Sequence, residues 1–370
     1  MRGSPEVVVI GAGIVGAACA RALAAQGREV LVLDARLGAA TDAGMGHLVA
    51  LDDNPAELAL CSYGLRLWHE LAPQLDASCA WNRCGTLWMA ADDVELAWAH
   101  TKAQRLREAG VPCQWLDAKA LAEAEPALRP GLVGALRVSG DATVYAPRVA
   151  HWLLAQEPRR LQFSQEEVLA LPEDGSVRTQ LHCYRPLHIV LAAGVHATRL
   201  CPELPVVPKK GLLVVTDRYP GHVHHQLVEL GYMASAHQRS GASVAVNVQP
   251  RPTGQLLIGS TRQYDSQDAS VDPALLAQLL RRAISYLPGL AGACALRSWS
   301  GLRPATPDGL PLIGRHPQRA RLWLAVGHEG HGVTTALSTA EQLAALMAGA
   351  SPPLKQADYA WRSFNSELDA

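Results

Sequence analysis

A glycine-rich turn near the N-terminus has the residue types and the spacing to hold a phosphate-containing cofactor. The segment Val7–Gly16 reads Val-Val-Val-Ile-Gly-Ala-Gly-Ile-Val-Gly, so three glycines follow an apolar run directly. This GxGxxG pattern is informative where it follows a strand and opens a helix. Gly11 would allow a tight turn, Gly13 a close approach of the backbone to a pyrophosphate, and Gly16 close packing of the helix on the strand. The segment predicts a dinucleotide site; the alternative is a glycine turn that binds nothing.

The residues around this turn complete a strand–helix–strand unit. The apolar pattern predicts a strand over Val7–Ile10, a helix over Ile14–Gln26 that ends at Gly27, and a strand over Glu29–Leu33. Asp34 follows the second strand, at about the spacing at which a carboxylate accepts hydrogen bonds from a ribose. That position favours FAD or NAD over a 2′-phosphorylated cofactor.

Length and composition exclude several classes of protein. The 370 residues are 49% apolar and 18% charged, which indicates a folded globular chain of two domains, or one core with a large insertion. Lys and Arg total 33 against 34 Asp and Glu, and only five of the bases are lysine, so a polyanionic partner is disfavoured.

Cysteine usage and hydropathy suggest where the protein works. The eight cysteines include no CxxC pair, which argues against a zinc ribbon or an iron–sulfur cluster and favours reduced thiols in the cytosol. Arg2 and the apolar run Val7–Ala20 superficially resemble a secretory signal, but the glycine turn explains that run better. No stretch reaches the ~18 to 20 uninterrupted apolar residues that a transmembrane helix needs. We expect a cytoplasmic protein, with any attachment to the inner membrane made through a partner.

Further periodic segments suggest how the rest of the chain is organised. Helical spacing of apolar residues predicts helices over Ala56–Leu75, Glu95–Ala109 and Val333–Met347. Continuous apolar runs predict strands over Pro186–Ala193 and Leu322–Val326. A turn-rich stretch between Val244–Val248 and Leu256–Ile258 predicts a hairpin. Nucleotide-type elements thus stand at the start, middle and end of the chain, with hairpin-like sequence between them. The order predicts a nucleotide domain assembled from discontinuous segments, with a second, antiparallel domain inserted.

Four motifs resemble those of the D-amino-acid oxidase superfamily. They are Thr41–His47, Val190–Gly194, Gly301–Gly314 and Gly327–Gly332, and they occur in that family's order between Val7 and about Met347. Within the superfamily the chain is most similar to the glycine oxidase, sarcosine oxidase and bacterial D-amino-acid dehydrogenase branch. More narrowly, Asp-Ala-Gly-Met-Gly-His at 42–47 is similar to the FAD-bearing β subunits of bacterial hydroxyproline dehydrogenase complexes.

The resemblance implies a fold of α/β plus antiparallel β type. A Rossmann-like FAD-binding domain would be built from residues 1–85, 141–205 and 300–350. An inserted substrate-binding domain of mixed antiparallel sheet and helices would take residues 86–140 and 206–299, and residues 351–370 would form a C-terminal tail.

The resemblance also implies which residues contact FAD. The helix that starts near Val333 would point its N-terminus at the pyrimidine carbonyl of the flavin ring, where it would stabilise the negative charge of the reduced form. The expected cofactor contacts are Gly11, Gly13, Ile14, Val15, Gly16, Asp34, Ala35, Arg36, Ala43, Gly44, Met45, Gly46, Val168, Ala192, Ala193, Gly194, Gly301, Arg303, His328, Glu329, Gly330, His331, Gly332, Val333 and Thr334.

Four residues are expected on the substrate side. By resemblance, Arg303 of Gly-Leu-Arg-Pro would clamp a substrate carboxylate, which suits the two parallel donors of a guanidinium. His47 could lie over the flavin, or it could be a hydrogen-bonded core histidine. Tyr232 and Met233 would line the substrate face of the inserted domain. No metal site is expected, because the His-x-His-His run at 222–225 has no cysteine or paired acid nearby in sequence and suggests a solvated loop.

Two departures from the family pattern refine the expected chemistry. Gly301 stands where sarcosine oxidases carry a flavin-linked cysteine, so FAD should be non-covalent. Leu257 stands where they carry a lysine that activates oxygen, so electrons should pass to a partner subunit or carrier.

The expected reaction is oxidation of a small amino or imino acid, D-hydroxyproline or D-proline first, by hydride transfer from Cα to flavin N5. The alternatives are a glycine, sarcosine or D-amino-acid oxidase that uses oxygen, a structural FAD-binding subunit of a larger complex, and an enzyme acting on a modified tRNA base.

Overall fold

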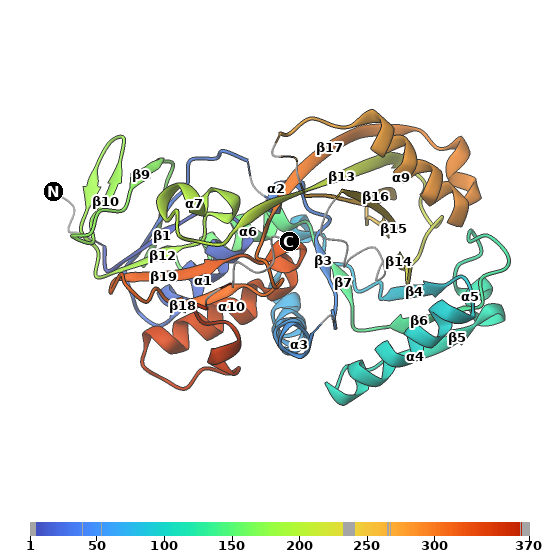
Figure 1. The fold of residues 1–370 in the computed structure, drawn as a ribbon, viewed down its shortest axis with the longest axis horizontal. Helices are drawn as coiled ribbons and strands as arrows, with labels where there is room; N and C mark the ends of the chain where they lie inside the picture. Colours follow the sequence, from blue (N-terminus) through green and yellow to red (C-terminus); the bar gives the residue numbers. More distant parts are fainter. Residues whose placement is uncertain are drawn as a thin grey trace.

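The structure is a computed structural model that describes residues 5–38, 40–52, 54–231, 241–264, 266, 268–362 and 364. Two large β-sheets, each covered by helices, lie toward opposite ends of an elongated molecule (Figure 1). In the described part of the chain no helix is both long enough and apolar enough to cross a membrane.

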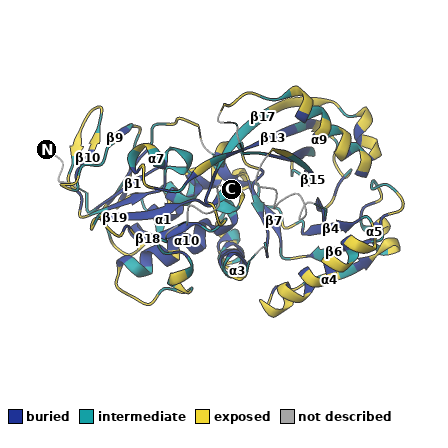
Figure 2. Ribbon diagram, viewed as in Figure 1, coloured by how far each residue is buried: buried dark blue, intermediate teal, exposed yellow. Residues whose placement is uncertain are grey.

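The first sheet has six strands and carries the glycine turn. Its order is β18 (Leu312–Arg315), β19 (Leu322–Val326), β12 (His188–Leu191), β1 (Val7–Ile10), β2 (Val30–Leu33) and β8 (Leu161–Ser164). The strands from β19 to β8 pair in parallel, whereas β18 is antiparallel to β19. Strands β1 and β19 are completely buried, as central parallel strands covered on both faces should be (Figure 2).

Helices from three parts of the chain pack on this sheet. They are α1 (Ile14–Ala25), α6 (Ala146–Ala155) and α10 (Gly332–Met347), and a fourth helix, α3 (Pro55–Leu71), packs on α10. Gly64 of α3 lies so close to α10 that an added Cβ would stand 2.3 Å from the Thr334 carbonyl oxygen. The indole of buried Trp68 donates to the carbonyls of Val333 and Thr334 at 3.0 and 3.1 Å. These contacts fix the first turn of α10, which faces the candidate site.

The second sheet has eight strands and lies at the other end of the molecule. Its order is β17 (Ala295–Ala305), β13 (Val207–Arg218), β16 (Gln255–Gln263), β15 (Ala242–Pro250), β14 (Gln226–Glu229), β4 (Thr86–Ala90), β6 (Gly134–Val138) and β5 (Gln114–Asp117). Helices α4 (Asp93–Glu108), α5 (Ala118–Ala124) and α9 (Pro273–Tyr286) pack against it and leave their outer faces exposed (Figure 2). Long ladders join β13 to its neighbours β17 and β16, so residues on these strands keep fixed relative positions.

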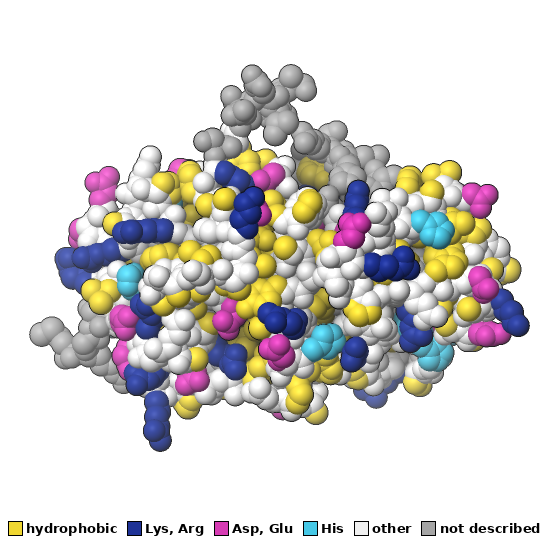
Figure 3. All heavy atoms as spheres, turned by 90° about the horizontal axis from the view of Figure 1, so that it is seen from below, with side chains coloured by type: hydrophobic (Ala, Val, Ile, Leu, Met, Phe, Trp, Pro, Cys, Tyr) yellow, Lys and Arg dark blue, Asp and Glu magenta, His cyan; other side chains and the backbone are white. Residues whose placement is uncertain are grey.

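Small elements complete the described chain. They are α2 (Ala40–Ala43), the pair β3 (His47–Leu48) and β7 (Ala142–Thr143), the three-stranded sheet of β9 (Val168–Ala170), β10 (Val177–Thr179) and β11 (Cys183–Tyr184), and α7 (Ala197–Leu200). Lys and Arg side chains are interspersed with Asp and Glu on the face shown in Figure 3.

Most predicted elements are present, and two are shorter than predicted by more than one residue at an end. The helix predicted to Leu75 stops at Leu71 and continues as a 3-10 turn over Ala72–Gln74, because Pro73 cannot donate the next α-helical hydrogen bond. The strand predicted over Pro186–Ala193 is confined to His188–Leu191. The predicted fold class is confirmed; the exact domain boundaries stay a prediction.

Candidate active site

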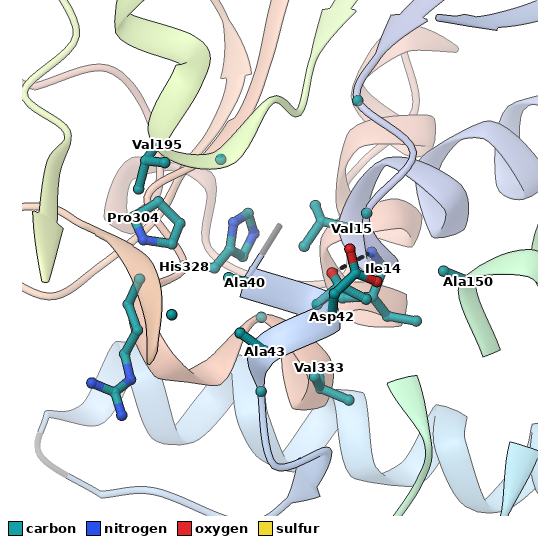
Figure 4. Close-up of a pocket in the computed structure, with 18 of the residues that line it drawn as sticks. Ile14, Val15, Ala40, Asp42, Ala43, Ala150, Val195, Pro304, His328 and Val333 are labelled. Atoms are coloured by element: carbon teal, nitrogen blue, oxygen red, sulfur yellow. Dashed lines mark hydrogen bonds between the residues drawn. The ribbon is translucent and has the colours of Figure 1, made fainter. Parts of the chain in front are cut away.

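The glycine turn, the head of α10 and one face of the second sheet line a single cavity of about 870 Å³. That volume is in the range of small-molecule and cofactor sites. Figure 4 shows Val195 and Pro304 on one side of the cavity and Ala150 on the other. Segments far apart in sequence therefore enclose one site.

Only glycine can occupy the critical positions of the N-terminal turn. Gly11 has φ +105°, and a Cβ there would stand 2.4 Å from the Ala192 carbonyl oxygen. A Cβ on Gly16 would stand 1.9 Å from the Gly11 carbonyl oxygen. The backbone thus lies open to the cavity at the N-terminus of α1, which is the arrangement that binds a pyrophosphate.

Two polar side chains hold this turn in place. Asp34, at the end of β2, accepts from the backbone N–H of Ala12 at 2.7 Å and from that of Arg36 at 2.6 Å. Each carboxylate oxygen keeps a further lone pair with which to accept a ribose hydroxyl. Thr41 of α2 accepts from the Ile14 N–H at 2.9 Å.

The head of α10 forms the next wall. Gly327 has φ +81°, and a Cβ there would stand 2.5 Å from the Thr306 methyl group. Burial lowers the pKa of His328 to about 3, and its Nε2 lies 3.0 Å from Thr339 Oγ1, so the imidazole is neutral. Thr334 donates to the His47 carbonyl at 3.1 Å, which ties α10 to β3. The glycine turn, Asp34 and this helix N-terminus fit the pyrophosphate, ribose and pyrimidine parts of FAD.

His47 is buried and neutral in this cavity. Burial lowers its pKa to about 4, and the positive charges of Arg251 and Arg303 act in the same direction. Its Nε2 lies 3.2 Å from the Asn247 amide oxygen, so this nitrogen carries the proton and donates it. Two roles were predicted for His47, a hydrogen-bonded core histidine and a residue beside the flavin. The structure shows a buried, hydrogen-bonded histidine that also lines the cavity.

Arg303 projects from β17 across the neighbouring strand. Its Nη1 donates to the Thr261 carbonyl of β16 at 3.1 Å. A Cβ added at Gly211 of β13 would stand 2.5 Å from both Nη1 and Nη2, so the guanidinium lies directly over this glycine. Gly211 therefore provides the space that Arg303 occupies at the cavity wall.

The structure gathers nearly all the predicted site residues around this one cavity. Every predicted contact in the described chain lines it except Gly16, which lies behind the turn against Gly11. Tyr232 and Met233 lie outside the described residues. Leu257 is buried against Met45 and Leu213.

Several lining residues were not predicted. Asn247, Ser260 and Arg262 come from the hairpin β15–β16. Asn247 stands between the core residues Val246 and Val248, so its period-two position was a usable signal. Ser260 and Arg262 have the same parity as the core residues Leu256 and Ile258, so alternation would not have found them. Glu166 also lines the cavity, and hydroxyl donors such as Thr179, at 2.7 Å, help to lower its pKa to about 2 despite its burial.

The expectation of a solvated His-x-His-His loop is met only in part: the segment is a loop and the His224 side chain is 51% exposed, but a buried carboxylate lies beside it. The fully buried carboxylate of Glu125 accepts from the backbone N–H of His224 at 2.9 Å and of His225 at 2.7 Å. It also contacts His225 Nδ1 at 2.7 Å, and that side chain is 12% exposed. Glu125 is a hundred positions away in sequence, so no local pattern could reveal it.

Comparison with known proteins identifies the family. The sequence pattern of the DAO family, described as FAD dependent oxidoreductase, matches residues 6–346. The chain belongs to the DAO family of FAD-dependent oxidoreductases.

Its relatives within the DAO family include glycine oxidases. The chain is 32% identical to the glycine oxidase of Pseudomonas aeruginosa over 96% of its own length and 98% of the relative's. It superposes on the crystal structure of glycine oxidase from Geobacillus kaustophilus with a TM-score of 0.87 at 26% identity, covering 98% and 99% of the two chains. The L-proline dehydrogenase of P. horikoshii shares the fold, with a TM-score of 0.86 at 21% identity, over 95% of this chain and 96% of that one. This DAO-family chain is therefore an FAD-dependent amine oxidoreductase.

Proposed function

We propose that the protein oxidises a small amino or imino acid at Cα, with D-hydroxyproline or D-proline as the first candidates, and passes the electrons to a partner subunit or carrier. The observation that carries this proposal is the position of Arg303, whose guanidinium lines the same cavity as the glycine turn. Bound FAD would supply the acceptor for the hydride that leaves Cα.

Arg303 has the chemistry to orient such a substrate. A guanidinium offers two parallel N–H donors to a carboxylate, which fixes the direction of the Cα–H bond as well as the position of the acid. His47 is neutral at physiological pH, so it can exchange hydrogen bonds without adding a second positive charge next to the substrate amine. The substrate amine must be neutral when hydride leaves, and none of the named side chains is required as its base.

The electron acceptor is proposed from the chemistry at one position. Leu257 offers no positive charge and is packed among apolar side chains, so it does not supply the cation that assists electron transfer to oxygen.

FAD is proposed to be non-covalent, since none of the eight cysteines, all of which are described, lines the cavity.

A glycine, sarcosine or D-amino-acid oxidase that reduces oxygen is the second candidate. The glycine oxidases among the relatives favour it. A structural FAD-binding subunit is the candidate from another class. The presence of Arg303 in the cavity, where we propose that it binds a substrate carboxylate, speaks against this candidate. The interspersed charges of Figure 3 offer no support for a tRNA substrate.

The visible spectrum of the purified protein tests these candidates. It should be recorded anaerobically before and after addition of D- and L-amino and imino acids, including D-hydroxyproline, D-proline, glycine and sarcosine. Bleaching of the flavin bands by one compound, with slow recovery in air, is the expected result. Fast recovery with stoichiometric peroxide would favour the oxidase, and a flavin that no compound bleaches would favour the structural subunit.

A further inference from the structure

The side-chain amide of Asn247 has one polar atom with a partner and one without. Its Oδ1 accepts from Nε2 of His47 at 3.2 Å. Its Nδ2 carries two N–H donors and makes no hydrogen bond within the part of the chain that the structure describes. Asn247 is half-buried and lines the cavity. A donor without an acceptor is costly in such a place, so it indicates a ligand group that completes it.

The wall on either side of this amide cannot accept its hydrogen bonds. Asn247 pairs with Val228 of β14 on one side and with Gly259 of β16 on the other. Val228 pairs in turn with Trp88 of β4, and both of these side chains line the cavity. None of these three neighbours has a side chain with an acceptor atom. The N–H groups of Asn247 therefore stand alone on this stretch of the sheet.

Asn247 stands further along the sheet than the guanidinium of Arg303. That guanidinium lies over Gly211 of β13 and donates to the Thr261 carbonyl of β16. The strand of Asn247, β15, is the next one after β16. Neighbouring strands are ~4.8 Å apart, so one to two strand spacings, about 5 to 10 Å, separate the guanidinium from the strand of Asn247. A substrate held through its carboxylate at Arg303 can thus reach Asn247 with its ring or side chain.

We propose that Nδ2 of Asn247 donates a hydrogen bond to a hydroxyl group on the ring or side chain of the substrate, and that His47 positions the amide for this contact. The inference rests on the proposed function and narrows its substrate class to hydroxylated amino or imino acids. Of the two first candidates it selects D-hydroxyproline. A hydroxyl oxygen is the smallest neutral acceptor, and it matches a neutral amide. His47 donates to Oδ1, which leaves the opposite edge of the amide, with its NH2 group, to the ligand.

Ligand binding to the oxidised holoenzyme tests this contact without turnover. Cyclopentanecarboxylate and 3-hydroxycyclopentanecarboxylate have the rings of proline and 4-hydroxyproline without the nitrogen, so they cannot be oxidised to an imine. Binding is followed by the change that they cause in the flavin bands. The hydroxylated acid should bind about fivefold more tightly, as one neutral hydrogen bond predicts. In Asn247→Leu this ratio should fall to about one. Gln255→Leu, which removes an amide from β16 outside the cavity, should keep the ratio within about twofold.

Two variants of His47 test its positioning role. His47→Gln keeps an N–H donor for Oδ1 of Asn247 and should retain the preference for the hydroxylated acid, whereas His47→Leu should lose most of it. Equal loss in both variants overturns the positioning role. Equal binding of the two acids to the wild type, or an unchanged preference in Asn247→Leu, overturns the contact itself. A folded Asn247→Leu protein that no longer holds FAD also overturns it, because the amide then serves the cofactor. If Asn247→Leu does not fold, Asn247→Ala is measured in its place.

Turnover separates failure of this inference from failure of the proposed function. Anaerobic flavin reduction by cis- and trans-4-hydroxy-D-proline is compared with reduction by D-proline. Faster reduction by a hydroxylated compound, with a preference that disappears in Asn247→Leu, supports the inference. Equal reduction by the three compounds overturns the inference and leaves the proposed function standing. Tighter binding of the hydroxylated cyclopentane acid, with no reduction by any amino or imino acid, overturns the proposed function alone.

Discussion

The amide oxygen of Asn247 accepts a hydrogen bond from Nε2 of His47 at 3.2 Å, and this contact joins β15 of the second sheet to β3 beneath the first turn of α10. The hydrogen bond by itself raises the pKa of His47, but burial lowers this pKa by more, and the result is about 4. Burial therefore keeps His47 uncharged, and the contact with Asn247 fixes one tautomer within the cavity.

Exchanging that amide for a carboxylate should charge His47. In Asn247→Asp the new anion would favour the imidazolium, so the pKa of His47 should rise from about 4 toward or above its ordinary value. The histidine would then titrate between pH 5 and 8, and the rate of flavin reduction should acquire a dependence on pH in that range. NMR titration of the imidazole checks the pKa directly. Asn247→Leu is the control: it removes the hydrogen bond without adding charge, and an equal rise there would contradict this account.

A methyl group at Gly211 should displace Arg303. The Cβ of Gly211→Ala would stand 2.5 Å from two guanidinium nitrogens, so the side chain must leave its place at the cavity wall. Loss of bidentate carboxylate binding should lower kcat/KM by about 10- to 100-fold while FAD stays bound. Arg303→Lys should cause a loss of similar size, because an ammonium cannot replace the planar donor pair. If Gly211→Ala turned over substrate at the wild-type rate while Arg303→Lys did not, the assigned position of the guanidinium would be wrong.

A methyl group at Gly16 should prevent retention of FAD. Its Cβ would stand 1.9 Å from the Gly11 carbonyl oxygen, so the turn could not keep the path that opens α1 to the cavity. The ratio of flavin to protein absorbance after purification measures the effect, and we expect it to fall severalfold. Gly292→Ala is the matched control, since no atom lies within 4 Å of its added Cβ. Equal flavin content in both variants would count against the cofactor role of the turn.

Asp141 should make stability depend on pH. Burial raises the pKa of its carboxyl to about 7, although the Ala50 N–H donates to it at 3.3 Å. Between pH ~4 and 7 the folded protein keeps a proton that the unfolded chain has lost, so this group lowers the free energy of unfolding as pH rises. Asp141→Asn lacks that titration. Its stability relative to wild type, measured by urea unfolding of the holoenzyme, should therefore increase by about 2 to 3 kcal/mol from pH 5 to pH 8. A pH-independent difference would show that Asp141 is ionised in the folded state.

The sequence was most informative where local backbone geometry dictates residue type. Gly16 could be assigned from one turn because the atom nearest its added Cβ, the Gly11 carbonyl oxygen, belongs to that turn. The Ala192 carbonyl that lies against Gly11 follows a strand far away in sequence, so only the spacing of the glycines could indicate Gly11. Arg303 was reached only through a family resemblance. The surroundings of Arg303 depend on how β13 pairs with β16 and β17. These strands are some fifty to ninety positions apart in sequence, and no local pattern encodes their pairing. The same holds for Glu125 beside His225 and for Asn247 beside His47.

Two glycines, Gly211 of β13 and Gly301 of β17, pair across neighbouring strands at the cavity wall, and this has a consequence for how the protein could acquire new substrates. The residues that hold the adenosine and pyrophosphate parts of FAD would come from turns of the six-stranded sheet, whereas Arg262 and Arg303 stand on strands of the other sheet. Gly301 is an exception, because a Cβ there would stand 2.5 Å from the Cβ of Ala43 in α2. We therefore expect substitutions at the cavity-facing positions 260 and 262 of β16 to change the substrate side of the cavity while the flavin is kept, and substitutions at Gly301 to disturb both.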